Sequence, residues 1–149
     1  MFDLVIADHV LFYCENIPQV LAECRRVLKD EGRFLCSTYG KQHMWEITDL
    51  VQQFHKEIVL SAEVLYERFG LENGENLLAP YFPEIQMRRY EDAIEIAEAE
   101  PLISYILSCH GNQNQLLLNQ YKEFREFVSA RVADGFHITK DAGIFLCRK

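Results

Sequence analysis

The sequence predicts an α/β fold in which helices flank a mixed sheet of about four strands. Residues 2–40 follow the order strand, helix, glycine turn and strand, which is the order of a βαβ unit. Such a unit implies two parallel strands joined by a right-handed crossover. Residues 136–148 alternate apolar and polar side chains around an Asp-x-Gly sequence, which predicts a hairpin ending in an antiparallel strand.

The elements of the βαβ unit each have a local signal. Phe2–Ala7 is almost continuously apolar, which predicts a strand covered on both faces. Asn16 is a suitable N-cap for a helix, and Pro18 fits the first turn because it has no N–H to leave unpaired. Apolar residues then recur at helical spacing until Gly32, which we expect to end the helix in the left-handed conformation. Residues 33–38 form the second predicted strand.

The middle of the chain is predicted to be mainly helical, from the spacing of its apolar residues. The predicted elements are a helix over residues 44–54, a shorter helix capped by Ser61 and ended by Gly70, a strand over residues 85–90, and helices over residues 99–109 and 113–132.

Composition narrows the class of protein. The 149 residues predict one domain, 1–149. Asp and Glu number 23 against 15 Lys and Arg, so the net charge of -8 repels phosphate backbones and anionic lipid. We therefore expect no nucleic acid and no membrane as the main partner. The five cysteines form no close pair, which favours reduced thiols in a cytoplasmic protein.

Several common site motifs are missing. The seven glycines form neither G-x-G-x-x-G nor G-x-x-x-x-G-K, so this chain lacks the usual backbone cradle for a phosphate or an adenosyl group. The histidines and cysteines show neither H-x-x-x-H nor C-x-x-C spacing, and we expect no metal site.

Polar side chains follow both strands of the βαβ unit. Asp8 and His9 come directly after the first strand, and Tyr39 and His43 follow the second. In open α/β sheets, ligands bind just beyond the carboxyl ends of the strands. A ligand site is one interpretation, and the other is a polar loop that leads into a helix.

The same residues carry a family resemblance. Residues 2–11, Phe-Asp-Leu-Val-Ile-Ala-Asp-His-Val-Leu, resemble the fourth-strand motif of class I S-adenosylmethionine-dependent methyltransferases. Residues 16–29 and 32–34 resemble the next helix and the fifth strand. Of the family's Leu-Lys-Pro-Gly-Gly turn, only the first two residues and the last glycine are present here. Residues 90–92 and 140–145 are similar to small-molecule-type members. The resemblance implies a partial Rossmann-like methyltransferase fold.

The resemblance also implies an activity and a site. The reaction would be methyl transfer from S-adenosylmethionine to a small-molecule acceptor, with no catalytic residue identified. The cofactor would lie against Ala7, Asp8, His9 and Val10, and the acceptor pocket would be lined by Tyr13, Tyr39, His43 and Trp45.

The family's glycine loop and its acidic ribose ligand would both precede residue 1. We therefore expect the chain to be the C-terminal part of such a domain, with an incomplete cofactor site. The alternative is a non-catalytic binding or assembly module on a partial Rossmann-like scaffold, while a dehydrogenase remnant fits the antiparallel end less well. A first strand without its neighbour would leave an open edge, which predicts a homodimer through residues 3–7.

Overall fold

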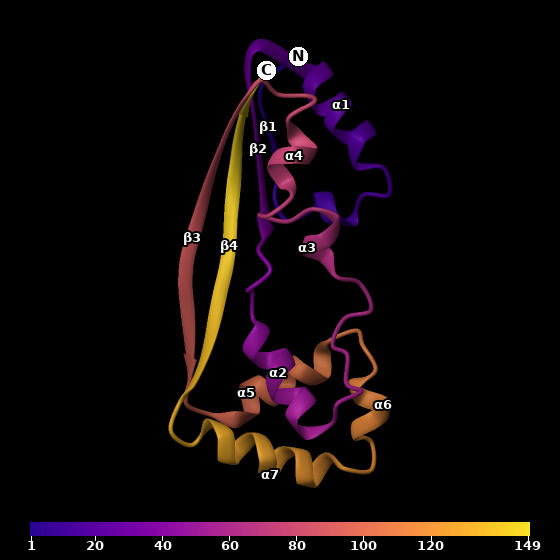
Figure 1. Cartoon of the computed structure of the whole chain (residues 1–149), viewed down its shortest axis with the longest axis vertical. Coiled ribbons are helices and arrows are strands. Elements are labelled where there is room, and N and C mark those ends of the chain that lie inside the picture. The colour runs from indigo at the N-terminus through magenta and orange to yellow at the C-terminus, as the bar shows by residue number, and fades with distance from the viewer. The chain divides into compact units, whose positions relative to one another are not determined.

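The computed structural model describes all 149 residues, whose contacts divide into two compact units. The first unit comprises residues 1–43, 64–91 and 141–149, and the second comprises residues 44–63 and 92–140. In chain order the elements are β1 (Phe2–Ala7), η1 (Leu11–Tyr13), α1 (Ile17–Val27), β2 (Leu28–Tyr39), α2 (Trp45–Phe54), α3 (Leu65–Arg68), α4 (Gly74–Leu78), β3 (Glu84–Ile96), α5 (Ala99–Ser108), α6 (Gln113–Leu117), α7 (Tyr121–Val132) and β4 (Phe136–Arg148) (Figure 1).

The four strands form one mixed sheet in the order β1-β2-β4-β3. β1 pairs with β2 in parallel, with Ala7 opposite Cys36. β4 pairs with β2 in the antiparallel direction, with Phe145 opposite Cys36. The predicted α/β class, the parallel pair and the antiparallel C-terminal strand are confirmed.

Helix α1 begins where its cap predicts. The side chain of Asn16 accepts a hydrogen bond from the backbone N–H of Gln19 at 3.1 Å, and Pro18 lies in the first turn. Leu21, on the apolar stripe of this helix, is fully buried in the core of the first unit.

The predicted role of Gly32 is wrong. Helix α1 ends at Val27, and β2 begins at the next residue, Leu28, so Gly32 lies inside a strand. Its backbone is not left-handed, but a Cβ at this position would lie 2.8 Å from the carbonyl oxygen of Lys29. Glycine is therefore required here because there is no room for a side chain, and not because of the backbone conformation.

The predicted C-terminal hairpin is also wrong, because β4 is one continuous strand from Phe136 to Arg148. The Asp-x-Gly sequence that suggested a turn has other uses. Asp141 is only 5% exposed and forms an ion pair with Arg89 of β3. A Cβ at Gly143 would lie 2.7 Å from the carbonyl oxygen of Arg88, so this glycine allows β3 to approach closely.

In the middle of the chain, the observed bounds of the helices and strands differ from the predicted ones. Residues 113–132 form two helices, α6 and α7, instead of one. Ser61 caps no helix, because its hydroxyl donates to the carbonyl of Glu63, and α3 is only four residues long. The strand predicted over residues 85–90 extends to Ile96 as β3, and α4 had no prediction. The helices α2 and α5 are confirmed within one or two residues.

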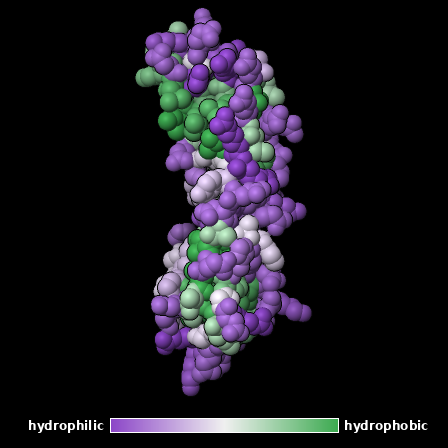
Figure 2. Space-filling model, turned by 90° about the vertical axis from the view of Figure 1, so that its left-hand side faces the viewer, coloured by the Kyte–Doolittle hydropathy of each residue, from purple (hydrophilic) through white to green (hydrophobic).

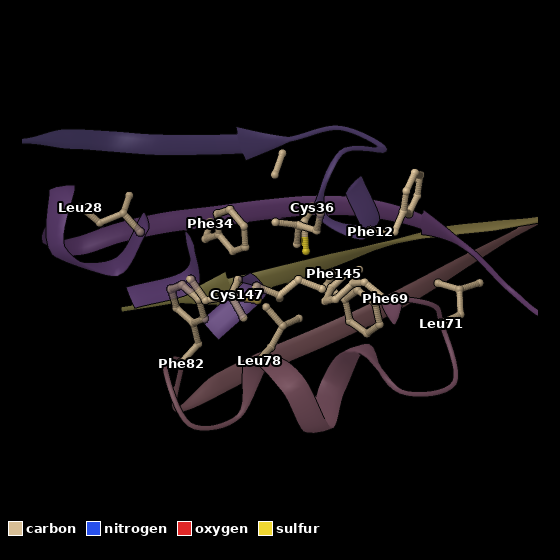
Figure 3. Packing of buried hydrophobic residues seen from close by; sticks show 14 residues of the cluster. Phe12, Leu28, Phe34, Cys36, Phe69, Leu71, Leu78, Phe82, Phe145 and Cys147 are labelled. Atoms are coloured by element: carbon tan, nitrogen blue, oxygen red, sulfur yellow. The ribbon is translucent and has the colours of Figure 1, made fainter. Parts of the chain in front are cut away.

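Each unit has its own hydrophobic core. In the first unit, alternate residues of β2 and β4 (Phe34, Cys36, Phe145 and Cys147) meet side chains from the chain segment around α4 (Figure 3). The ring of Phe34 stacks on that of Phe82, with centroids 5.3 Å apart. The second unit buries a separate cluster from α2, α5, α6 and α7. No helix is both long and apolar enough to cross a bilayer.

Candidate functional site at the carboxyl ends of the parallel strands

The parallel pairing of β1 and β2 brings their carboxyl ends to one edge of the sheet. Because Ala7 lies opposite Cys36, Asp8 and His9 emerge beside the last residues of β2. This is the edge at which open α/β sheets bind ligands. All residues of the site described below belong to the first unit.

Ser37 ties this edge together. The backbone N–H of His9 donates to the Ser37 hydroxyl at 3.0 Å, and that hydroxyl donates in turn to a carboxylate oxygen of Asp8. His9 has a φ of 46°, a left-handed conformation that few residues other than glycine adopt. The hydrogen bond to Ser37, a residue only 5% exposed, holds that conformation in place.

Aromatic rings gather next to this hydrogen-bonded group, with Tyr39 at their centre. The Tyr39 ring lies 4.4 Å from that of His9 and 4.3 Å from that of His43, measured between ring centroids. The Phe12 ring is stacked at 5.7 Å from the Tyr39 ring. Four residues from two segments of the chain, 9–12 and 39–43, thus present ring faces and edges to one another, and we call them the aromatic cluster.

The electrostatics of the cluster keep its phenol neutral. Burial raises the pKa of Tyr39, and the nearby Tyr13 and Asp8 raise it further. Tyr39 can therefore donate a hydrogen bond but is not a base at neutral pH. The Nδ1 atom of His9 is buried and has no hydrogen-bond partner, so it is a polar atom that a ligand could satisfy.

Asp141 of β4 fixes the loop that carries His43. Its backbone N–H donates to Nδ1 of His43 at 3.2 Å, and its carboxylate accepts from the N–H of Gln42 at 3.1 Å. The same carboxylate lies 3.4 Å from Nε of Arg89. Because Nδ1 of His43 accepts a hydrogen bond, the neutral ring carries its proton on Nε2.

The structure brings some of the predicted site residues together and leaves others apart. Asp8, His9, Tyr39 and His43 come together as described, while the small side chain of Ala7 is buried in the core. Their roles toward a ligand stay predictions.

The remaining predicted residues lie at the margin or elsewhere. Val10 is exposed, and Tyr13 is 64% exposed with its ring edge against Phe12. Trp45, at 48% exposure, begins α2 in the second unit and is not a member of the aromatic cluster.

Sequence reasoning missed Asp141, which was assigned to a turn. The signal that could have found it is a carboxylate within an alternating strand pattern, where a charged side chain needs a buried partner. Chemically, the site offers ring faces, one carboxylate and imidazole nitrogens. No group of three or more His, Cys, Asp or Glu side chains is placed to hold a metal ion.

Comparison with known proteins gives a family match for the segment that contains β1 and most of β2. Residues 1–36 match the family model of the methyltransferase domain. A stretch of 48 residues is 35% identical to the biotin biosynthesis bifunctional protein BioHC of Saccharophagus degradans, covering 32% of this chain and 9% of that protein.

Two solved structures align with 99% of the chain. One is an S-adenosylmethionine-dependent methyltransferase of Thermotoga maritima, described as a possible histamine N-methyltransferase, with 12% identity, a TM-score of 0.47 and 56% of its length covered. The other is phosphoethanolamine N-methyltransferase 2 of Haemonchus contortus in complex with S-adenosyl-L-methionine, with 17% identity, a TM-score of 0.45 and 33% of its length covered. The chain thus spans about half of the first protein and a third of the second. The family match over residues 1–36 confirms the resemblance to the methyltransferases.

Proposed function

We propose that the chain takes part in S-adenosylmethionine-dependent methyl transfer to a small-molecule acceptor. The observation that carries this proposal is the family match, because residues 1–36 contain β1, Asp8, His9, α1 and most of β2. The matched segment therefore supplies one strand end of the candidate site and the strand that bears the other.

The residues present fit the adenine and methionine side of the cofactor. Ala7, Asp8, His9 and Val10 would line it, with the unpaired Nδ1 of His9 available to a polar group of the ligand. The carboxylate of Asp8 would favour a positively charged ligand, and the aromatic cluster offers ring faces for stacking. When bound, S-adenosylmethionine supplies a methyl group on a positively charged sulfur.

The acceptor would lie against Tyr13, Tyr39 and His43, which all belong to the first unit. Tyr39 stays protonated because its pKa is raised by burial, so it would orient an acceptor as a hydrogen-bond donor. The Asp141 N–H holds the His43 ring in one orientation. Alignment of the reacting groups supplies much of the rate enhancement in such a transfer, so this site needs no strong base.

We expect the chain by itself to bind the cofactor weakly, since none of its glycines forms a G-x-G-x-x-G loop. The test is an NMR titration of the 15N-labelled chain with S-adenosylmethionine. Saturable shifts should appear in residues 7–13 and 36–43, with a dissociation constant of about 1 mM, or about -4 kcal/mol. Asp8→Asn should weaken binding severalfold, whereas Asp30→Asn, at an exposed position, should not.

A lack of saturable shifts, or an equal effect of the two Asp→Asn variants, would contradict the proposed cofactor site. The second candidate function, a non-catalytic binding or assembly module, would then be favoured.

A further inference from the structure

The loop of residues 40–43, which follows β2, is held by two carboxylates from other parts of the first unit. We call it the strand-end loop. The backbone N–H of Lys41 donates to both carboxylate oxygens of Glu72, at 3.1 and 3.2 Å. The N–H of Gln42 donates to the carboxylate of Asp141 at 3.1 Å. Each carboxylate therefore fixes one peptide unit of the loop.

The other two backbone N–H groups of the strand-end loop are paired as well. That of Gly40 donates to the backbone carbonyl of Asp141 at 2.9 Å, and that of His43 donates to the carbonyl of Gly40 at 3.2 Å. All four N–H groups of the loop are thus satisfied, and three of them depend on Asp141 or Glu72. The conformation of the loop therefore follows the positions of these two residues.

One guanidinium group, that of Arg89 in β3, joins the two carboxylates. Its Nη2 atom lies 3.2 Å from Oε1 of Glu72, and its Nε atom lies 3.4 Å from Oδ1 of Asp141. A guanidinium presents its N–H donors in a rigid fork, so a single arginine can hold two acceptors at a fixed spacing. Arg89 therefore sets the spacing of the two groups that determine the loop.

The strand-end loop carries one ring of the aromatic cluster. The ring of His43 lies 4.3 Å from that of Tyr39, and its Nδ1 atom accepts the N–H of Asp141 at 3.2 Å. The carbonyl of Tyr39 accepts the N–H of Leu71, the residue before Glu72, at 3.0 Å. A shift of either carboxylate would therefore move the backbone that carries both rings.

We propose that Arg89 is a positioning residue of the candidate site, which fixes the orientation of the His43 ring against Tyr39. It acts through the carboxylates of Asp141 and Glu72 and is not itself a catalytic residue. All five residues belong to the first unit. The proposal rests on the proposed function, because the orientation of the ring matters only to a ligand bound at this site.

The first test uses the ligand-free chain and the variant Arg89→Gln. Side-chain 15N NMR at pH about 8, where an unperturbed histidine ring is neutral, reports which nitrogen of His43 carries the proton. The wild-type ring should be protonated on Nε2 alone, whereas Arg89→Gln should show both tautomers. Amide hydrogen exchange of Lys41 and Gln42 should be at least about tenfold faster in the variant. A role confined to stability would leave the tautomer of the folded protein unchanged.

The second test adds about 1 mM S-adenosylmethionine and compares the amide shift changes at the two strand ends. The ratio of the changes in residues 39–43 to those in residues 7–10 should fall about fivefold in Arg89→Gln. This ratio separates a misplaced loop from weaker binding, because weaker binding reduces both sets of shift changes together.

Glu72→Ala provides a second variant, because Arg89→Gln deprives the nearly buried Asp141 of its ion pair and carries a larger risk of unfolding. Glu72 is exposed, so its substitution should leave the circular dichroism spectrum unchanged. It removes the acceptor of the Lys41 N–H and should change the tautomer and the shift ratio in the same direction. The matched control is Glu75→Ala, which removes the same charge from an exposed position of α4.

Arg88→Gln is the matched control for Arg89→Gln. Successive side chains of a strand point to opposite faces of the sheet, and Arg88 lines a hollow with Arg33 and Arg148. Figure 2 looks onto the side of β3 and β4 and shows many hydrophilic side chains there, so the loss of one surface charge should leave the fold intact. Neither the His43 tautomer nor the shift ratio should change.

Two outcomes would overturn the proposal and leave the proposed function in place when the wild type binds the cofactor. One is an unchanged tautomer and shift ratio in both Arg89→Gln and Glu72→Ala, and the other is an equal change in Arg88→Gln. Absence of any saturable shift in the wild type would instead contradict the proposed cofactor site. The tautomer comparison in the ligand-free chain would then still decide whether Arg89 positions His43.

Discussion

The backbone N–H of His9 donates to the hydroxyl of Ser37 across 3.0 Å, which ties the loop after β1 to the interior of β2. The two residues are distant in sequence but are brought together by the parallel pairing. Because the same hydroxyl donates to Asp8, one side chain determines the position of both polar residues at the strand end.

Replacing Ser37 by Ala should therefore destabilise the protein. The partly buried N–H of His9 would lose its partner, at a cost of about 1–3 kcal/mol in the free energy of unfolding. Urea denaturation measures this change. Ser129→Ala, at an exposed position of α7, serves as the control and should stay within about 0.5 kcal/mol. Equal effects of the two substitutions would show that the Ser37 hydroxyl does not hold the loop.

A second prediction concerns pH and Glu46 of α2. Partial burial alone would raise the pKa of Glu46, but hydrogen bonds from the hydroxyl and the N–H of Thr139 outweigh it and lower the pKa below its usual 4.5. The ionised form is thus favoured by folding. Its contribution to stability is full above pH about 4.5 and is lost as the pH falls through the lowered pKa of the folded state.

Thr139→Val removes one of these two donors and should reduce the loss of stability on acidification, as measured by thermal unfolding between pH about 6 and about 3. Thr48→Val is the control, because Thr48 is at an exposed position of α2, the helix that carries Glu46. An unchanged pH profile in Thr139→Val would mean that the hydroxyl does not set the pKa of Glu46.

The five cysteines should differ in reactivity. All are free thiols, and burial raises the pKa of Cys36 above its usual range and that of Cys147 to about 12. Since the thiolate is the reactive form, both should resist a disulfide reagent at pH about 8 in the folded protein. All five should react in denaturant without reductant. Prompt modification of Cys36 in the folded chain, detected by peptide mass spectrometry, would contradict the described core.

The free edge of β1 leads to the prediction of a homodimer. β1 has a neighbour, β2, on one side only. Antiparallel pairing of two copies about Leu4 would set Phe2 opposite Ile6 and Asp3 opposite Val5, so no like charges would face each other. Light scattering after size exclusion should then give twice the 17.5 kDa of one chain.

Leu4→Lys should return the chain to a monomer, because it places two ammonium groups at the two-fold axis. Val5 is unsuitable for this test, since its side chain packs against the core. Val59→Lys, at an exposed apolar position of the second unit, is the matched control and should leave the dimer intact. A monomeric wild-type chain would refute edge pairing.

The parts of the fold with strong local signals could be predicted from the sequence. The continuous apolar run of Phe2–Ala7 and the Asn16 cap each gave the correct element. The run was also expected to be covered on both faces, which is wrong, because Phe2, Leu4 and Ile6 are exposed. Gly32 was misassigned because a glycine has two uses, a left-handed backbone or a close contact, and the sequence does not distinguish them.

The continuous strand β4 could not be predicted for a different reason. An Asp-x-Gly sequence favours a turn locally, but Arg89 and the Gly40–His43 loop satisfy the Asp141 carboxylate within the strand. These partners lie far away in the sequence, so local propensity carries no sign of them. The candidate site shows the same limit: the strand-end residues were predictable, whereas the partner that fixes His43 was not.

The closeness of Gly40 to Asp141 has an evolutionary consequence. A Cβ at position 40 would lie 2.0 Å from a carboxylate oxygen of Asp141, a distance that no repacking of β4 relieves while that carboxylate stays in place. A relative of this chain can therefore gain a side chain at position 40 only if the carboxylate at position 141 moves out of its place or becomes smaller. The two sites should change together during divergence.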